Sequence, residues 1–212
     1  MRKIQRVLIA FSIVALGFTG SASATTFSGY GAPSSNAYLA GGTVIDFESE
    51  TLGAFTSLTI GGVTFSTTAN EVGYINNDYA GNYNTTGKSL VNTYAANGFF
   101  NLFIDFSSPV NAFGFNWGAA DQPWVLTAYD SSSNFLDSYV LPATYGSNAG
   151  DYFGIAAAGI KSATLQTEVP GDYVFVDNFT YSGRQVPEPS ALLLLGSGLL
   201  GLALFRRMRK EA

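Results

Sequence analysis

The chain of 212 residues contains no cysteine and no histidine. Without cysteine it forms neither disulfides nor thiolate metal sites, so an exported domain must draw its stability from its core or from bound metal. Without histidine it lacks the side chain best suited to general base catalysis at neutral pH and to zinc or iron binding. A Ser-His-Asp triad, a cysteine nucleophile and imidazole metal centres are therefore excluded.

Positive charge is also scarce over most of the chain. Seven of the ten lysines and arginines lie at positions 2, 3, 6, 206, 207, 209 and 210. Between Thr25 and Val186, three cations oppose thirteen carboxylates, which gives this segment a net charge of −10. Such a surface makes nucleic acid and anionic lipid headgroups poor partners, whereas divalent cations and neutral sugars are better ones. No Gly-rich phosphate loop, G-x-S-x-G or H-E-x-x-H motif occurs in the sequence.

The N-terminal residues have the layout of a secretory signal peptide. Three cations precede an apolar run from Val7 to Phe18, and small residues follow, with Ala22 and Ala24 in an A-x-A cleavage pattern. A membrane span is the alternative, which the short run and its uncharged C-terminal flank disfavour. We expect residues 1–24 to be removed during export.

The last part of the sequence combines Pro187-Glu188-Pro189, an uncharged leucine-rich run from Ala191 to Phe205, and a basic cluster. The basic residues are Arg206, Arg207, Arg209 and Lys210. As a helix the run covers about 22 Å, against a hydrocarbon core of roughly 30 Å, and snorkelling arginines would close much of the gap. The pattern predicts a transmembrane helix over 190–205, with the cations as a stop signal on the cytoplasmic side. A buried core helix is the alternative, which the absence of a polar face disfavours.

This arrangement resembles the PEP-CTERM sorting signal of Gram-negative bacteria over residues 187–210. The resemblance implies that a membrane-embedded exosortase recognises the tail and processes it near the Pro-Glu-Pro motif. The helix is then a transient anchor in the inner membrane, and the passenger reaches the cell surface or the exopolysaccharide matrix of a biofilm. The two prolines fit this route because they keep the motif extended and accessible to an enzyme.

The segment between the two signals has an all-β composition. Residues 25–42 are rich in Ser, Gly and Ala and predict a flexible leader. Over 43–182, runs of β-branched and aromatic residues alternate with turn clusters, which predicts roughly ten short strands. Residues 183–186 then form a linker. We predict two antiparallel sheets packed as a β-sandwich of jelly-roll type, in preference to a barrel or propeller.

Local patterns place several strands within this segment. Gly61-Gly62 predicts a tight hairpin between two short strands, and a second hairpin is expected to join 124–129 to 135–141. Two further strands are predicted over 99–106 and 110–117. In the second of these, alternate aromatic residues share one face, which is typical of a half-buried strand.

Phrases such as DFES, SPVNAFGFNW and VDNFTY resemble a β-sandwich domain common among PEP-CTERM cargo and, more loosely, jelly-roll carbohydrate-binding modules. In such modules an acidic residue of the opening strand and an Asp of the closing strand hold a structural calcium, which corresponds here to Glu48 and Asp177, with Asp46 as a further partner. Calcium takes six to eight oxygen ligands, so carbonyl groups would complete the site. The alternative is that these carboxylates are solvated positions on the outer face of a sheet.

The aromatic residues suggest a sugar-binding site, because flat rings with polar rims suit a pyranose. Trp124 begins a predicted strand at a loop end, and Tyr74, Tyr79 and Tyr83 lie in an Asn-rich stretch, 71–88, that predicts a long loop. The alternative is that these rings close the ends of the sandwich core.

Together these observations favour a non-enzymatic exported protein with a structural or adhesive role at the cell surface or in the matrix. One alternative is a calcium-assisted carbohydrate-binding module. Another is a carboxylate-dependent glycoside hydrolase, whose two acids would lie about 5 Å or roughly 6.5 to 9.5 Å apart. The thirteen acidic residues between Thr25 and Val186 offer many pairs of this kind and single out none.

Overall fold

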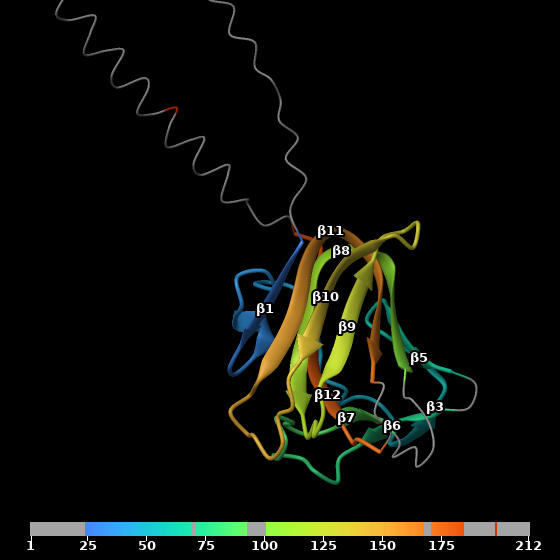
Figure 1. Cartoon of the computed structure of the whole chain (residues 1–212). Coiled ribbons are helices and arrows are strands. Elements are labelled where there is room, and N and C mark those ends of the chain that lie inside the picture. The colour runs from blue at the N-terminus through green and yellow to red at the C-terminus, as the bar shows by residue number, and fades with distance from the viewer. Residues whose placement is uncertain (1–23, 69–70, 93–100, 168–170, 185–197, 199–212) are drawn as a thin grey trace, which may run out of the picture.

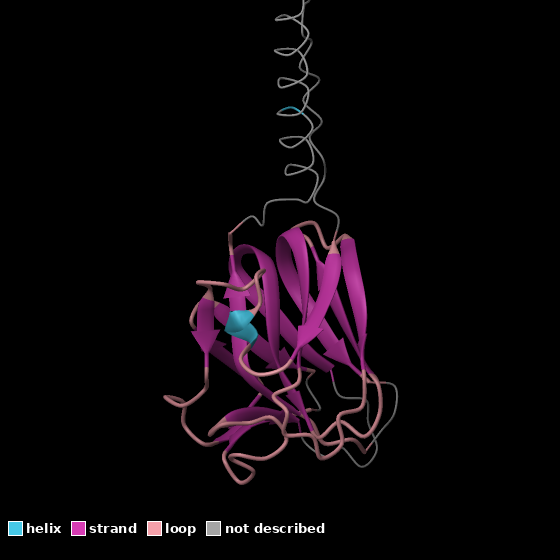
Figure 2. Ribbon diagram, turned by 90° about the vertical axis from the view of Figure 1, so that its left-hand side faces the viewer, coloured by secondary structure: helices cyan, strands magenta, loops and turns pink. Residues whose placement is uncertain are grey.

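The computed structural model describes residues 24–68, 71–92, 101–167 and 171–184, together with Gly198. The predicted signal peptide cleaved after Ala24 lies outside the described residues except for Ala24 itself, and the sorting signal lies outside them except for Gly198. Within the described ranges, no helix is long and apolar enough to cross a membrane. Between residues 24 and 184, strands dominate the described residues, accompanied by one 3-10 turn, η1 (Pro33–Ser35) (Figures 1 and 2).

The described strands number twelve, and every pair is antiparallel, which confirms the all-β prediction. In chain order they are β1 (Thr25–Gly29), β2 (Thr43–Ile45), β3 (Gly53–Phe55), β4 (Ser57–Ile60), β5 (Val63–Thr67), β6 (Gly73–Asn76), β7 (Ser89–Asn92), β8 (Asn101–Gly118), β9 (Trp124–Tyr129), β10 (Phe135–Leu141), β11 (Tyr152–Gln166) and β12 (Phe175–Ser182).

Strand pairing produces two layers that share the long strands β8 and β11. One layer follows the order β4-β5-β8-β11-β9-β10 and uses residues 101–106 of β8. The other follows β1-β11-β8-β12, uses residues 112–118 of β8, and continues from β12 through β2 on one part and β7, β6 and β3 on another. The pairing of β11 with β8 has register shifts between Ala156 and Ser162. Such irregularities bend strands, and here they lie where β8 and β11 pass from one layer to the other. The result is a sandwich-like fold.

The sequence prediction of two strands, over 99–106 and 110–117, is wrong for this region. A single strand, β8, runs from Asn101 to Gly118, with the exposed Ser107-Ser108-Pro109 at the crossing between layers. A proline is tolerated there because the ladder is locally irregular and its missing N–H costs no regular pairing. Both predicted hairpins are confirmed. Gly61 and Gly62 have φ values of 55° and 82°, which only glycine adopts readily in a two-residue turn.

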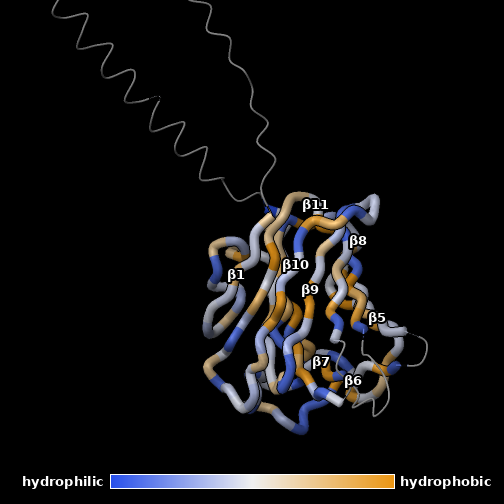
Figure 3. Tube along the Cα trace, viewed as in Figure 1, coloured by the Kyte–Doolittle hydropathy of each residue, from blue (hydrophilic) through white to orange (hydrophobic). Residues whose placement is uncertain are grey.

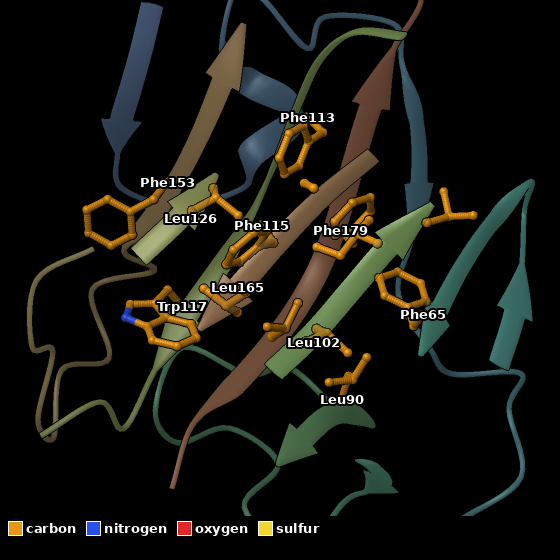
Figure 4. Packing of buried hydrophobic residues seen from close by; sticks show 14 of the residues in the cluster. Phe65, Leu90, Leu102, Phe113, Phe115, Trp117, Leu126, Phe153, Leu165 and Phe179 are labelled. Atoms are coloured by element: carbon orange, nitrogen blue, oxygen red, sulfur yellow. The ribbon is translucent and has the colours of Figure 1, made fainter. Parts of the chain in front are cut away.

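The main core lies between the two layers, where alternate side chains of each strand meet. Figure 4 shows Phe115 and Phe179 among Leu102 and Leu165, and the Phe115 and Phe179 rings stack with centroids 6.0 Å apart. The predicted aromatic face of the second half of β8 is part of this core. In Figure 3, hydrophobic stretches alternate with polar ones along the strands, as this arrangement requires.

Residues 25–42 do not form the flexible leader that their composition predicts. β1 pairs with β11, and Phe27, Leu39 and Tyr152 belong to a second hydrophobic cluster on the outer face of the shared strands. Leu39 is fully buried. Burying such side chains gains about 1.5 to 3 kcal/mol each, which offsets part of the entropy that a Ser- and Gly-rich segment loses on ordering.

Candidate functional site

A row of side chains crosses the outer face of β12, β7 and β6. Phe175 pairs in register with Val91, and Val91 with Tyr74, so the three side chains share one face. Val176 belongs to the main core, and its neighbour Phe175 therefore points to the opposite, outer face. Tyr74 is 36% exposed, while Phe175 is buried beneath other rings.

Three tyrosines pack over Phe175. The Tyr83 ring stacks on Phe175 at 5.7 Å with the planes only 6° apart, whereas Tyr79 and Tyr173 meet it edge-on at 5.4 and 5.2 Å. Tyr79 also contacts Tyr83 and Tyr173, and it is 41% exposed. We call Tyr74, Tyr79, Tyr83, Tyr173 and Phe175 the tyrosine patch. It presents partly exposed phenol rings on a buried aromatic base.

The loop that carries Tyr79 and Tyr83 is held by its own hydrogen bonds. The Thr85 hydroxyl donates to the carbonyl oxygens of Tyr79 and Asn82, both at 2.9 Å, and the Thr85 N–H donates to Asn82 at 3.0 Å. The Tyr83 carbonyl lies against Gly118, where a Cβ would fall 1.6 Å from that oxygen. The sequence predicts a loop over 71–88, but β6 lies within this range, so the irregular part is shorter than expected.

Asn84 ties the same loop to the sheet. Its amide group donates to the Trp117 carbonyl at 2.8 Å and to an Asp151 carboxylate oxygen at 3.0 Å, and its side-chain oxygen accepts the Gly150 N–H at 2.8 Å. Tyr83 and Asn84 both have left-handed backbones, with φ of 53° and 62°. This conformation is unfavourable for tyrosine, and the contacts of Asn84 and Gly118 hold it in place. The patch is therefore preformed.

Polar groups meet at the rim of the tyrosine patch. Burial, followed by the neighbouring Tyr79 and Asp78, raises the pKa of the Tyr173 phenol above its ordinary value. Asp78 accepts a hydrogen bond from the Asn76 amide at 2.9 Å, which fixes its carboxylate beside the loop. The rim thus offers hydroxyl and carboxylate groups beside apolar ring faces, a combination that suits an uncharged polyol.

Trp124, predicted as part of a ligand platform, lies in the core instead. It is fully buried, its ring meets Trp117 edge-on at 5.5 Å, and its indole N–H donates to Asp172 at 2.7 Å. The strand alternation carries Trp124 inward together with Leu126 and Ala128. The alternative interpretation, that this ring closes the end of the core, describes its position.

Of the predicted calcium ligands, the structure brings Glu48 and Asp177 together. Asp177 is fully buried, and its carboxylate accepts the N–H and hydroxyl of Thr86 at 2.8 and 3.0 Å and the Asn178 N–H at 2.6 Å. Burial raises the pKa of Asp177, the hydrogen bonds oppose the shift, and the charge of Glu48 adds to it. Glu48 accepts the Lys88 N–H at 2.7 Å, so both carboxylates bind the segment 86–88.

The third predicted ligand, Asp46, accepts the backbone N–H of Glu48 at 3.2 Å. Beside it, the Lys88 ammonium donates to the carbonyl oxygens of Glu48 and Glu50 at 2.9 and 2.7 Å. Within the described ranges, no group of three or more acidic side chains is arranged to hold a metal ion. A cation here would have to draw on carbonyl oxygens as well as the two carboxylates.

Sequence reasoning missed Tyr173 and Phe175, although a signal was present. Strand alternation from residue 173 places Tyr173, Phe175 and Asp177 on one face, opposite Val174 and Val176. That face lies under the Tyr-rich loop only because β12 pairs with β7 and β8, which the sequence does not disclose.

Comparison with curated proteins finds no match for the chain. Solved structures similar to parts of it include bacteriophage CBA120 tailspike protein 4, with 17% identity and a TM-score of 0.38 over 58% of this chain and 20% of the tailspike domain. An F5/8 type C domain from Bacteroides fragilis aligns over 61% of this chain and 97% of its own, with 13% identity and a TM-score of 0.39. A family 29 carbohydrate-binding module aligns over 80% and 97%, with 10% identity and a TM-score of 0.31.

Residues 185–210 match the family described as the PEP-CTERM protein-sorting motif. The match begins two residues before the predicted start and includes Pro187-Glu188-Pro189, the apolar run and the four terminal cations. The protein therefore carries a PEP-CTERM protein-sorting motif in its C-terminal residues 185–210.

Proposed function

We propose that this protein is non-enzymatic cargo, which an exosortase sorts to the cell surface or the exopolysaccharide matrix, where it has a structural or adhesive role. The match of residues 185–210 to the PEP-CTERM motif carries the proposal. The physical layout supports it, because an apolar run followed by four cations arrests in a membrane while two prolines keep the preceding motif extended.

The chemistry of the folded domain agrees with a binding or structural role. Its buried carboxylates serve the fold: Asp172 accepts four N–H groups, and Asp177 accepts groups from Thr86 and Asn178. A carboxylate whose oxygens already accept several hydrogen bonds from the protein is poorly placed to exchange protons with a substrate. The glycosidase alternative requires sugar release that single acid-to-amide changes abolish.

The experiment compares export in an exosortase-bearing host with a matched strain that lacks the exosortase. Intact-mass spectrometry of the wild-type protein should show loss of a C-terminal segment that begins near Pro187, and the domain should leave the inner membrane. Glu188→Ala should retain the tail and remain in the membrane fraction. Glu50→Ala changes a glutamate of the folded domain, outside the sorting motif, and should be processed normally.

Identical C-termini of the wild-type protein in both strains would contradict exosortase sorting. Departure of Glu188→Ala from the inner membrane with its C-terminal tail still attached would contradict it as well. Recovery of the wild-type protein in the cytosol with its first methionine would contradict export as a whole.

A second candidate function is calcium binding at Glu48 and Asp177, supported by the burial of Asp177 beside another carboxylate. The donor chemistry fits, because carboxylate and carbonyl oxygens are the ligands that calcium takes. Bound calcium would neutralise both acids and link the turn after β2 and the strand β12 to residues 86–88. It would compete there with the Lys88 ammonium.

Thermal melts of the purified protein in millimolar calcium, magnesium or chelator test this candidate. Selective binding to the folded state raises the Tm with calcium above that with magnesium. Asp177→Asn should lose that increment, whereas Asp105→Asn, an exposed control carboxylate, should retain it. Equal Tm values in all three solutions would dismiss the site.

A further inference from the structure

We propose that the tyrosine patch binds a neutral sugar chain, with Tyr79 and Tyr74 as its outermost rings. Both rings are substantially exposed, on adjacent parts of one outer face formed by β6, β7 and β12. Pyranose rings have apolar C–H faces and hydroxyl edges, and phenols offer the matching apolar face and polar rim. Neither Trp124 nor the Glu48 and Asp177 pair contributes to this site.

The patch is built before a ligand arrives. Tyr83 stacks on Phe175, Asn84 fixes the loop to the carbonyl of Trp117, and Thr85 closes the loop on itself. Binding therefore orders few side chains, and little of the interaction energy is lost to conformational entropy. Preorganised aromatic rings suit an uncharged ligand such as a sugar, which offers apolar C–H faces for stacking but no charge for an ion pair.

The charge distribution selects a neutral chain over an anionic one. Residues 24–184 contain three cations, and none belongs to the patch: Lys88 donates to the Glu48 and Glu50 carbonyls, Lys161 donates to the Phe106 and Ser107 carbonyls, and the Arg184 guanidinium lies near Gly41. Asp78 lies close enough to the Tyr173 phenol to contribute to its raised pKa, so a carboxylate borders this rim. An anionic polysaccharide would meet repulsion at this rim.

The same charge disfavours a second copy of the chain as the occupant. Two domains with a net charge of −10 each repel one another, and every ring of the patch except Phe175 carries a hydroxyl group that a dry protein interface would have to satisfy. A sugar supplies hydroxyl partners for these groups without adding charge.

Affinity electrophoresis tests the proposal with the full chain in mild detergent. Native gels contain hydroxyethyl cellulose, galactomannan or a soluble β-1,3-glucan, and a polygalacturonate gel is the anionic control. We expect retardation in at least one neutral gel and none in polygalacturonate. Tyr79→Ala and Tyr74→Ala should each weaken binding roughly three- to tenfold, the range for loss of one aromatic contact.

Tyr79→Phe keeps the ring and should lose less than Tyr79→Ala. Tyr30→Ala removes an exposed tyrosine outside the patch and should bind like the wild type. Near-UV circular dichroism and urea unfolding confirm that each variant is folded. Because the gels use purified protein, their outcome is independent of exosortase processing.

Absence of retardation in every neutral gel overturns the proposal. The proposal is also overturned if Tyr79→Ala and Tyr74→Ala are both retarded as strongly as the wild type, because the patch would then not be the site. A concentration-dependent dimer that Tyr79→Ala abolishes, without retardation by sugar, would show that the patch joins two copies of the chain. Preferential retardation by polygalacturonate would refute the neutral ligand class.

Discussion

Removal of the Asp172 carboxylate should destabilise this protein by about 2.5 to 6 kcal/mol. Asp172 is 6% exposed and accepts the backbone N–H groups of Asp121, Gln122 and Tyr173 at 3.0, 3.3 and 3.0 Å and the Trp124 indole N–H at 2.7 Å. In Asp172→Ala the buried indole N–H loses this acceptor, at a cost of about 1 to 3 kcal/mol. The three partly buried backbone donors recover some bonding from water and add about 0.5 to 1 kcal/mol each.

The indole share of this cost can be isolated by a double-mutant cycle. Trp124→Phe removes the N–H donor while keeping an aromatic ring in the core. If the hydrogen bond couples the two residues, Asp172→Ala should cost about 1 to 2 kcal/mol less in the Trp124→Phe background than in the wild type. Urea unfolding followed by far-UV circular dichroism measures all four proteins, because the midpoint and slope of the transition are compared rather than the size of the signal.

Additive free energies in the cycle would refute the coupling between Asp172 and Trp124. A loss below about 0.5 kcal/mol in Asp172→Ala, the range of ordinary surface changes, would refute the structural role of the carboxylate itself. Trp124→Phe should also keep wild-type retardation in the neutral sugar gels, since Trp124 lies in the core. If Trp124→Phe lost sugar binding without losing stability, Trp124 would be part of the ligand site after all.

Three further predictions follow from other parts of the structure. Burial and the charge of Glu48 raise the folded-state pKa of Asp177 above its ordinary value of 3.8. Without calcium, the stability of the wild type relative to Asp177→Asn should therefore fall as the pH rises from 3.8 through the folded-state pKa. A constant difference in Tm between the two proteins over this pH range would contradict the raised pKa. Leu39→Ala should cost about 2 to 5 kcal/mol in urea unfolding, because Leu39 is fully buried, and an unchanged midpoint would show that residues 25–42 do not stabilise the domain. Gly118→Ala should displace the loop of Tyr83 and increase its proteolysis, since the new Cβ would overlap the Tyr83 carbonyl; wild-type proteolysis would refute that contact.

Local features of the sequence predicted much of the fold. Period-2 alternation and β-branched composition identified most strands, and the hairpin at Gly61-Gly62 followed from the need for two positive φ angles in a short turn. The sorting motif is local too, since its order of prolines, apolar run and cations can be read without a fold. The roles of Glu48 and Asp177 as calcium ligands and the jelly-roll type remain predictions.

The candidate site was only partly predictable. Tyr74, Tyr79 and Tyr83 were expected near a ligand, and they lie in the tyrosine patch, but Tyr173 joins them from a segment almost a hundred residues away. Trp124 looked available at a loop end, yet the acceptor that satisfies its indole N–H, Asp172, also comes from a distant segment. Whether an aromatic ring faces water or the core depends on contacts and hydrogen bonds with residues that are distant in the sequence.

By itself, the sequence determined the PEP-CTERM sorting motif, the acidic histidine-free composition and the β-rich class, because composition and short-range spacing set each of these. The tertiary structure alone decided that β8 and β11 serve both layers, that residues 25–42 cover the outer face of a sheet, and which tyrosines gather over Phe175. A strand has two faces, and a sequence gives their alternation but not what packs against each one. That information resides in contacts between residues far apart along the chain.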